Sequence, residues 1–432
     1  MARLKIAYIG GGSTRAPGTV ASFIQQGDNF QGSEIVLIDF DPDKMSVIKA
    51  MADRMIRVRG LDMRISFTTD RQAGLTDCDT VLTSYRPGGF EARHQDETIP
   101  LKYGIVGQET QGPGGFFMAL RSIHVMQGIL ADMERVCPSA RLFNYTNPIN
   151  LVSEAVTHHS PIPILSFCEG PIYYPRQVAQ AAGLDPDKLD TVMVGLNHGC
   201  WSIRHTYDGA DAIPLLREAY AARLEAGLLT PFERRLLKLT VGMESVPSDY
   251  LLYYTFRDEM LAEARAKPTS RSQDIMARVP AYWAHYRKQA AAENPTLDPA
   301  QSRGGIHELE LAIDAMDAIY NDRKVILPVN IPNHGVLPSL PADRVVEIRG
   351  YLDQHGVVGL ADGDVPPHTR SLILALSEYQ SLAAEAAWSG RRIDAIRALA
   401  ANPLVLSFET AEALYDAMAA AQRDHLPERL LS

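Results

Sequence analysis

The chain has 432 residues, of which 46% are hydrophobic and 22% charged, and its formal net charge at pH 7 is −10. This length is enough for two domains or for one large domain with an insertion. The acidic balance argues against nucleic acid and anionic membranes as partners. It leaves small anionic substrates open, because local arginines can form an anion pocket inside an acidic protein.

The cysteines and the apolar segments indicate a reduced, cytoplasmic protein. Four cysteines lie far apart without CxxC spacing: Cys78, Cys137, Cys168 and Cys200. This usage differs from a disulfide framework. The apolar run near the start of the chain belongs to a predicted strand and is too short for a secretion signal. No apolar stretch reaches the ~18–20 residues that span a bilayer. We therefore expect no membrane association.

The first predicted element is a strand followed by a glycine turn and a helix. Gly10, Gly11 and Gly12 follow the apolar run KIAYI, and an amphipathic helix begins near Thr19. Such a turn lets the backbone approach a pyrophosphate at the positive end of the helix, and we assign Ser13 to the same cofactor contact. Arg15 stands where the third glycine of GxGxxG would be, so an ordinary tight βα turn is the alternative.

The next strands support a dinucleotide site. The strand SEIVLI ends at Asp39, 27 positions beyond Gly12, where an acidic residue binds the ribose 2′-hydroxyl of NAD and repels the 2′-phosphate of NADP. Further strands over 78–85 and 140–146, with a helix between them over 116–136, complete a parallel βαβ series. We predict a Rossmann-type NAD-binding domain over residues 1–200.

Two segments offer polar groups at the carboxyl ends of these strands. Asn147 precedes Pro148 at a strand end, where it either caps a helix or faces a ligand. Residues 86–123 read as a long loop that carries Arg93, Glu109 and two glycine turns. Long loops of this kind are commonly functional, and a salt-bridged surface loop is the alternative.

A thiol and an imidazole follow later buried segments. Cys168 and Glu169 stand together in SFCEG, and His198 stands in LNHGCW. Taken alone, Cys168 is most simply interpreted as a buried, inert cysteine and His198 as a histidine of the core.

The order of motifs resembles glycoside hydrolase family 4. GGGS, GGFEAR, GQET followed by GPGG, NYTNP, the cysteine followed by GLNH, and SDYLLYY occur in that family's order between residue 5 and about residue 275. The resemblance implies an NAD- and metal-dependent glycosidase, closest to the 6-phospho-glucosidase members.

The chemistry that the resemblance implies departs from the usual pair of carboxylates. NAD⁺ takes a hydride from sugar C3, a base removes the acidified C2 proton, and the aglycone leaves from C1. Water then adds and the hydride returns, so that no net redox occurs. The substrate is a sugar or sugar phosphate, and the anomer stays open.

The resemblance also implies roles for individual residues. Cys168 and His198 match the metal ligands, and the ion is Mn²⁺ or another divalent metal, although thiolate and imidazole by themselves would favour zinc. Tyr250 matches the base at C2, and Glu109 matches the residue that raises its basicity. Glu169 is the candidate acid for the leaving group, or else orients metal-bound water.

The residues Arg93, Asn147 and Arg271 match substrate-binding positions, and arginine forks suit phosphate or carboxylate oxygens.

The back half reads as a mainly helical, mixed α/β domain over residues 201–432. Helical periodicity appears in seven segments: 212–226, 232–241, 249–265, 271–291, 306–321, 369–389 and 407–422. Strands are predicted over 324–333 and 344–350. The whole is a lactate/malate dehydrogenase-like α/β fold, and its apolar helices favour a homo-oligomer, either a dimer or a tetramer.

Two other functions fit the Rossmann start. A 2-hydroxyacid dehydrogenase shares the strand that ends in Asn-Pro but has no use for a Cys/His metal pair. A non-catalytic NAD-sensing protein would not require Tyr250, Glu109 and that pair together.

Overall fold

A parallel sheet of six strands forms the first half of the computed structural model, which describes residues 1–303 and 310–432. The strands are β1 (Lys5–Ile9), β2 (Glu34–Ile38), β3 (Arg64–Thr68), β4 (Thr80–Thr83), β5 (Arg141–Asn144) and β6 (Ile164–Ser166). They lie in the order β3-β2-β1-β4-β5-β6, and every neighbouring pair is parallel. This is the Rossmann order, so the predicted fold class is confirmed.

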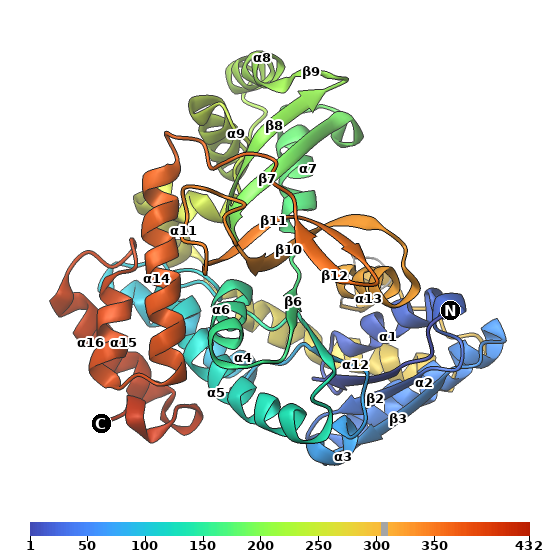
Figure 1. The fold of residues 1–432 in the computed structure, drawn as a ribbon. Coiled ribbons are helices and arrows are strands. Elements are labelled where there is room, and N and C mark those ends of the chain that lie inside the picture. Colours follow the sequence, from blue (N-terminus) through green and yellow to red (C-terminus); the bar gives the residue numbers. More distant parts are fainter. Residues whose placement is uncertain (304–309) are drawn as a thin grey trace.

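Helices cover both faces of this sheet (Figure 1). They are α1 (Ala16–Gln25), α2 (Pro42–Arg59), α3 (Arg71–Leu75), α4 (Gly89–Thr98), α5 (Gly112–Val136) and α6 (Ile149–His159). Strands β1, β2 and β4 are buried almost throughout, as expected of parallel strands packed on two sides. Two apolar clusters, one on each face, make up the core of this half.

One strand of this half was not predicted, and one sequence prediction fails. Strand β3 was not predicted, because its sequence RISFT places Arg64 and Phe67 at exposed positions and lacks a buried run. Residues 86–123 are not one long loop, since α4, a short 3₁₀ helix over Pro100–Tyr103 and the start of α5 occupy much of them. Only residues 104–111 remain an extended connection between helical elements.

The sheet continues past β6 with strands from the second half of the chain. These are β7 (Leu189–Leu196), β8 (Gly199–Tyr207), β9 (Ala210–Asp211), β10 (Val325–Pro332), β11 (Val345–Asp353) and β12 (Gly356–Gly359). Strand β10 pairs antiparallel with β6 through Asn330 and Ser166, and β11 joins β7 through Glu347 and Gly195. The predicted division at residue 200 lies inside β8 and stays a prediction.

The remaining helices lie in an upper lobe, in a lateral bundle or beside elements of the first half (Figure 1). They are α7 (Gly170–Ala182), α8 (Ala212–Glu225), α9 (Pro231–Met243), α10 (Leu252–Thr255), α11 (Arg257–Ala266), α12 (Arg271–Ala291), α13 (Leu311–Asn321), α14 (Arg370–Trp388), α15 (Arg392–Ala400) and α16 (Phe408–Ala421). α7 to α9 surround the β7–β8 hairpin, whereas α14 to α16 pack beside α5 and α6.

Most of the predicted helices of this half are present, with three differences. The segment 249–265 is interrupted at Phe256, where the backbone leaves the helical region between α10 and α11. The β7–β8 hairpin and α15 were not predicted. The predicted helix over 306–321 is observed from Leu311, and its first residues fall outside the described part of the chain.

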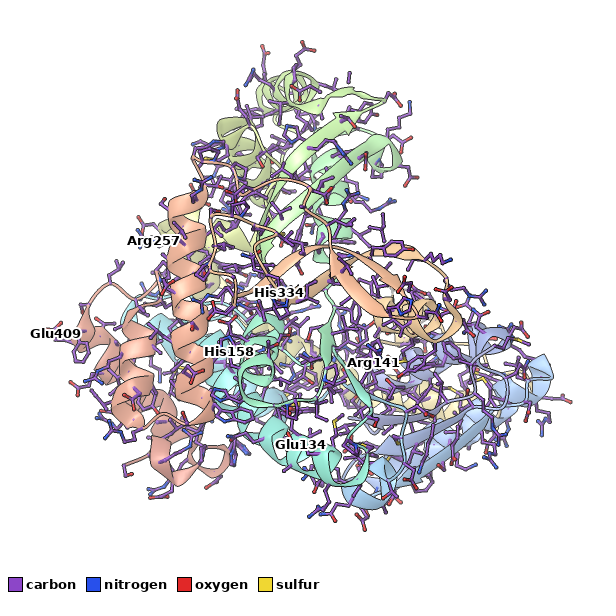
Figure 2. The ribbon with its side chains drawn as sticks, in the orientation of Figure 1. Glu134, Arg141, His158, Arg257, His334 and Glu409 are labelled. Atoms are coloured by element: carbon purple, nitrogen blue, oxygen red, sulfur yellow. The ribbon has the colours of Figure 1, made fainter. Side chains whose placement is uncertain are left out.

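The outer surface carries many charged side chains. Charged side chains such as Glu134, Arg257 and Glu409 are exposed (Figure 2). Within the described residues, none of the helices combines the length and apolar content needed to cross a bilayer. All four cysteines are free thiols, as predicted.

Candidate active site

One large cavity of about 1530 Å³ opens where the carboxyl ends of the parallel strands meet the second half of the chain. Its lining includes the glycine turn after β1, the ends of β2, β4 and β5, and the residues Cys168, His198 and Tyr250. This is the edge at which open α/β sheets bind ligands. The fold thus brings residues that are far apart in the sequence to one site.

The glycine turn is packed so closely that side chains are excluded. Gly10 has a φ of +94°, and a Cβ atom there would lie 2.1 Å from the carbonyl oxygen of Ser84. A Cβ atom on Gly12 would lie 2.9 Å from the carboxylate carbon of Asp39. Glycine is required at both positions for these reasons. Gly11 packs against Leu37, away from the cavity.

The residues around this turn fit a dinucleotide. Asp39 accepts a hydrogen bond of 2.9 Å from the Gly12 N–H, and it lines the cavity at the end of β2, where a ribose would lie. The Ser13 hydroxyl is buried and has no hydrogen-bond partner among the described residues. A buried orphan hydroxyl beside the N-terminus of α1 fits a phosphate oxygen.

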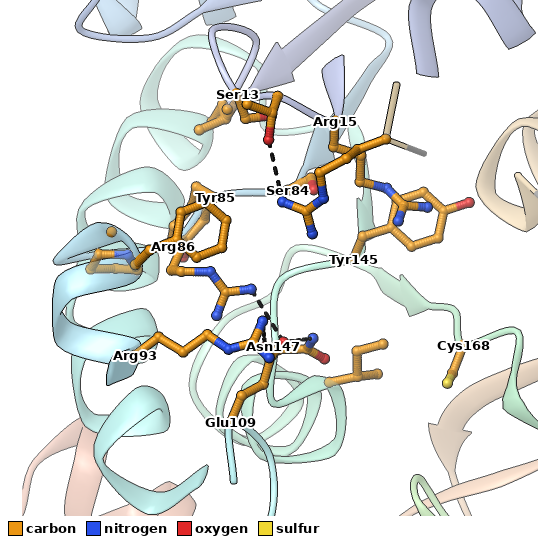
Figure 3. Close-up of a pocket in the computed structure, with 18 of the residues that line it drawn as sticks. Ser13, Arg15, Ser84, Tyr85, Arg86, Arg93, Glu109, Tyr145, Asn147 and Cys168 are labelled. Carbon is orange, nitrogen blue, oxygen red and sulfur yellow. Dashed lines mark hydrogen bonds and ion pairs between the residues drawn. The ribbon is translucent and has the colours of Figure 1, made fainter. Parts of the chain in front are cut away.

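A buried carboxylate, Glu109, stands at the centre of an arginine cluster (Figure 3). It forms ion pairs with Arg86 at 3.2 Å and with Arg93, and it accepts a hydrogen bond of 3.0 Å from the Asn147 side chain. Burial raises the pKa of Glu109, but the two arginines outweigh burial and hold this pKa at about 2. Glu109 is therefore ionised at every physiological pH.

The Asn147 side chain settles an alternative that the sequence left open. α6 begins at Ile149 with no side-chain cap, so capping is not the role of Asn147. Its amide faces the cavity and Glu109 instead.

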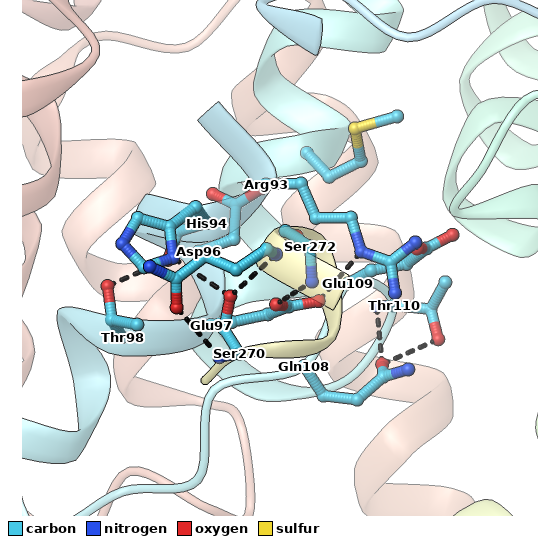
Figure 4. A network of polar contacts seen from close by, with 12 residues as sticks. Arg93, His94, Asp96, Glu97, Thr98, Gln108, Glu109, Thr110, Ser270 and Ser272 are labelled. Atoms are coloured by element: carbon cyan, nitrogen blue, oxygen red, sulfur yellow. Dashed lines mark hydrogen bonds and ion pairs between the residues drawn. The ribbon is translucent and has the colours of Figure 1, made fainter. Parts of the chain in front are cut away.

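Further contacts hold Arg93 in place from the outside (Figure 4). Arg93 donates a hydrogen bond of 2.7 Å to Glu97, and Glu97 accepts one of 2.8 Å from the Ser272 N–H. The start of α12 is thereby tied to the arginine cluster. Arg271 itself is exposed at this helix start and does not line the cavity, so its predicted contact with substrate stays a prediction.

The thiol of Cys168 and the imidazole of His198 face each other. Cys168 Sγ lies 3.5 Å from His198 Nε2, and both residues line the cavity. Donor atoms bound about 2.0–2.3 Å from one ion lie about 3–3.6 Å apart, so this spacing fits two ligands of a common metal. His198 Nδ1 contacts the Thr110 hydroxyl at 2.9 Å, an outer contact that orients a ligating imidazole.

The burial of Cys168 and His198 is compatible with the binding of a metal cation. Burial lowers the pKa of His198 to about 4, which keeps the imidazole neutral and able to ligate. Burial also raises the pKa of the Cys168 thiol to about 12, and a bound cation would displace that proton. No group of three or more His, Cys, Asp or Glu side chains suited to a metal occurs in the described part of the chain. The pair would thus leave coordination positions for ligand oxygens.

Tyr250 stacks directly on the His198 ring. The two ring centroids are 3.7 Å apart and the planes differ by 3°. Burial raises the pKa of Tyr250 well above its usual value, and the carboxylates of Asp249 and Glu109 add to this effect. Tyr250 is therefore a neutral phenol beside the Cys168–His198 pair, and a cation bound to that pair would lower its pKa and let it act as a base.

Glu169 also lines the cavity, but its carboxylate lies 3.6 Å from the Arg15 guanidinium. Arg15 in turn lies over the Tyr145 ring, 5.3 Å from its centroid. Arg15, which stands where a third glycine would be, thus contributes a cation to the cavity wall. The sequence did not suggest this role.

The sequence analysis also missed Arg86, Thr110 and Asp249. Arg86 stands just beyond the end of β4, a position where ligand contacts are common in this fold. Thr110 and Asp249 adjoin residues that the motifs had marked, but no sequence signal distinguished them.

Comparisons with known proteins identify the family. The model of "Family 4 glycosyl hydrolase" matches residues 5–184, and that of the "Family 4 glycosyl hydrolase C-terminal domain" matches residues 193–405. The "Probable 6-phospho-beta-glucosidase" of Bacillus subtilis is 34% identical over 98% of each chain. The chain belongs to glycosyl hydrolase family 4.

Solved structures agree with this assignment. A 6-phospho-alpha-glucosidase from gut microorganisms, in complex with NAD and Mn²⁺, superposes with a TM-score of 0.86 at 25% identity and covers 99% of both chains. Malate dehydrogenase from Plasmodium falciparum superposes with a TM-score of 0.54 at 11% identity, over 89% of this chain and all of that one. The latter likeness concerns the fold alone and matches the predicted dehydrogenase-like architecture.

Proposed function

We propose that the protein hydrolyses 6-phospho-glucosides with the help of NAD and a divalent cation, Mn²⁺ in the first instance. The observation that carries this proposal is the Cys168–His198 pair, 3.5 Å apart, in the same cavity as the glycine turn and Asp39. Relatives named as 6-phospho-glucosidases, one of them bound to NAD and Mn²⁺, support it.

The chain's residues have distinct tasks in this reaction. When bound, NAD accepts and returns the hydride of C3, and the cation acts as a Lewis acid toward the oxygens at C2 and C3. Tyr250, stacked on His198, accepts the C2 proton. Glu109 places negative charge near Tyr250, which raises the proton affinity of its phenolate, and a bound cation would lower the pKa so that the phenolate can form.

The arginine cluster positions the sugar and its phosphate. Arg86 and Arg93 both line the cavity, and their guanidinium groups suit phosphate oxygens. Asn147, which is oriented by Glu109, offers an amide to a sugar hydroxyl. Arg271 is the remaining predicted substrate contact.

We also propose that the protein works in the cytoplasm as a homo-oligomer. Leu406 and Phe408 are 77% and 48% exposed at the start of α16 and offer apolar surface for a second copy. Sedimentation or light scattering of the purified protein tests this, and a monomer at micromolar concentration would contradict it.

The assay offers nitrophenyl 6-phospho-glucosides of both anomers to the protein with NAD⁺, Mn²⁺ and a thiol reductant. We expect nitrophenol release from one anomer without net formation of NADH. The unphosphorylated glucosides serve as the matched control and should react much more slowly. Steady accumulation of NADH from a 2-hydroxyacid would overturn the proposal in favour of a dehydrogenase, and NAD binding without turnover of any substrate would favour a sensor.

A further inference from the structure

The cavity contains a carboxyl group that, unlike Glu109 and Glu169, has no ion-pair partner among the described residues. Asp249 lines the cavity and directly precedes Tyr250 in a 3₁₀ helix, Asp249–Leu251. Glu109 pairs with two arginines and Glu169 with Arg15. Asp249 has no ion pair within residues 1–303 and 310–432, and its Oδ1 atom is buried without a hydrogen-bond partner there.

The groups that face Asp249 are neutral or acidic. Tyr250 and Tyr253 come from its own segment, and the amide of Gln177 faces it from α7. Arg176, the nearest cation of α7 along the chain, pairs with Asp187 at 2.6 Å. Nothing among these groups stabilises a negative charge on Asp249 as the arginines do on Glu109.

This setting lets Asp249 hold a proton near neutral pH. Burial raises its pKa to about 6, and the Gln177 amide and the Tyr250 N–H offset only part of that rise. Two cavity carboxyl groups therefore differ widely, since the pKa of Glu109 is about 2. When the environments of two titratable groups make their pKa values differ in this way, one group commonly acts as an acid and the other stays charged.

Asp249 is also placed beside the group that removes the C2 proton. Tyr250 stacks on His198, and Tyr174 packs edge-on against Tyr250, with ring centroids 6.4 Å apart. Because C1 adjoins C2, a proton donor for the C1 oxygen must stand next to the base that serves C2. Asp249 meets this requirement through its position directly before Tyr250, whereas Glu169 lies 3.6 Å from the Arg15 guanidinium.

We propose that Asp249 is the general acid that protonates the oxygen of the leaving group, a role that rests on the function proposed above. Tyr250 takes the C2 proton, and the electron pair left at C2 forms the C1–C2 double bond. The C1–O bond breaks, its electron pair goes to the aglycone oxygen, and that oxygen receives the proton of Asp249. In the hydration step the Asp249 carboxylate accepts a proton from the water that adds to C1, and Tyr250 returns its proton to C2.

The test compares leaving groups of different basicity in wild type and Asp249→Asn. A nitrophenolate leaves without a proton, whereas a methanol or phenol leaving group requires one. We expect Asp249→Asn to lower kcat/KM for the methyl 6-phospho-glucoside at least about 100-fold, and for the nitrophenyl substrate by less than about tenfold. Wild-type activity on the methyl substrate should fall as the pH rises through the pKa of Asp249, and Asp249→Asn should lack this fall.

Two further variants keep the test decisive. Asp249→Glu retains a carboxyl group and should recover part of the rate on the methyl substrate. Asp258→Asn makes the same chemical change on the exposed face of α11 and should leave both rates unaltered. Equal losses on both substrates, or no loss on either, would overturn the acid role while the glycosidase proposal stands. A wild-type protein inactive on every 6-phospho-glucoside would remove both.

Discussion

The ion pair between Arg93 and Glu109 makes a quantitative prediction. Glu109 is 9% exposed, and its pKa is lowered from 4.5 to about 2 against the opposing effect of burial. One pKa unit corresponds to about 1.4 kcal/mol, so the ionised form is favoured by about 3 kcal/mol net. Because burial opposes this net value, the two arginines together contribute more than it, and Arg93 accounts for at least about 1 kcal/mol if the two contribute similarly.

A double-mutant cycle isolates that contribution. We compare the unfolding of wild type, Arg93→Met, Glu109→Gln and the double variant, without NAD or metal. The cycle removes the separate loss of the Arg93–Glu97 contact, which both Arg93 variants share. Unfolding entropy of about 2.1 cal/mol/K per residue over the 432-residue chain means that each kcal/mol shifts Tm by about 1 °C. We expect a coupling of at least about 1 °C.

The sign of the pH dependence follows from the lowered pKa. A carboxyl group whose folded pKa lies below its unfolded value contributes its full stability above the unfolded pKa, here 4.5. The contribution is lost only as pH falls from there toward 2. The coupling should therefore be the same at pH 8 and at pH 5. Additive single variants, or a coupling that disappears between these two pH values, would refute the assignment of a permanently ionised Glu109.

Two further substitutions probe the metal ligands and the glycine turn. Thr110→Val removes the hydroxyl that contacts His198 at 2.9 Å. We expect the Mn²⁺ affinity to fall about 10–100-fold, while the NAD affinity, measured by calorimetry, is retained. An unchanged Mn²⁺ affinity would contradict the orienting role of Thr110. Gly10→Ala places a Cβ atom 2.1 Å from the Ser84 oxygen, so NAD binding should be lost. Gly104→Ala is the matched control, because Gly104 also has a positive φ but nothing lies within 4 Å of an added Cβ. Equal NAD affinity in the two variants would show that the close approach of Gly10 to Ser84 is unimportant.

The parallel sheet was predictable because its strands are buried on both faces. β1, β2 and β4 are short apolar runs that end at glycine or at polar residues, and this pattern has few other interpretations. α4 could not be predicted in the same way. Its sequence GFEARHQDET has no apolar stripe, and it buries Arg93, Asp96 and Glu97 instead. Arg93 and Glu97 pair within the helix, but Asp96 is accommodated by a partner distant in sequence, Arg121.

The candidate site was predictable only where a motif resemblance marked it. Cys168 and His198 are 30 positions apart in sequence, and composition or spacing alone would leave them as an inert thiol and a core imidazole. The contacts of Thr110, Arg15 and Asp249 arise from tertiary packing, in which each residue meets partners from other elements. Local sequence carries no information about such partners, and this is why the roles of these residues became visible only in the structure.

The central claim, that Cys168 and His198 jointly hold the divalent cation beside NAD, is tested most directly by metal binding itself. Mn²⁺ titrations followed by electron paramagnetic resonance, with NAD present and thiols reduced, compare wild type with Cys168→Ser and His198→Ala. We predict one Mn²⁺ per chain in wild type and at least about 100-fold weaker binding in each variant, with NAD affinity preserved. Variants that bind Mn²⁺ as tightly as wild type would contradict the assignment.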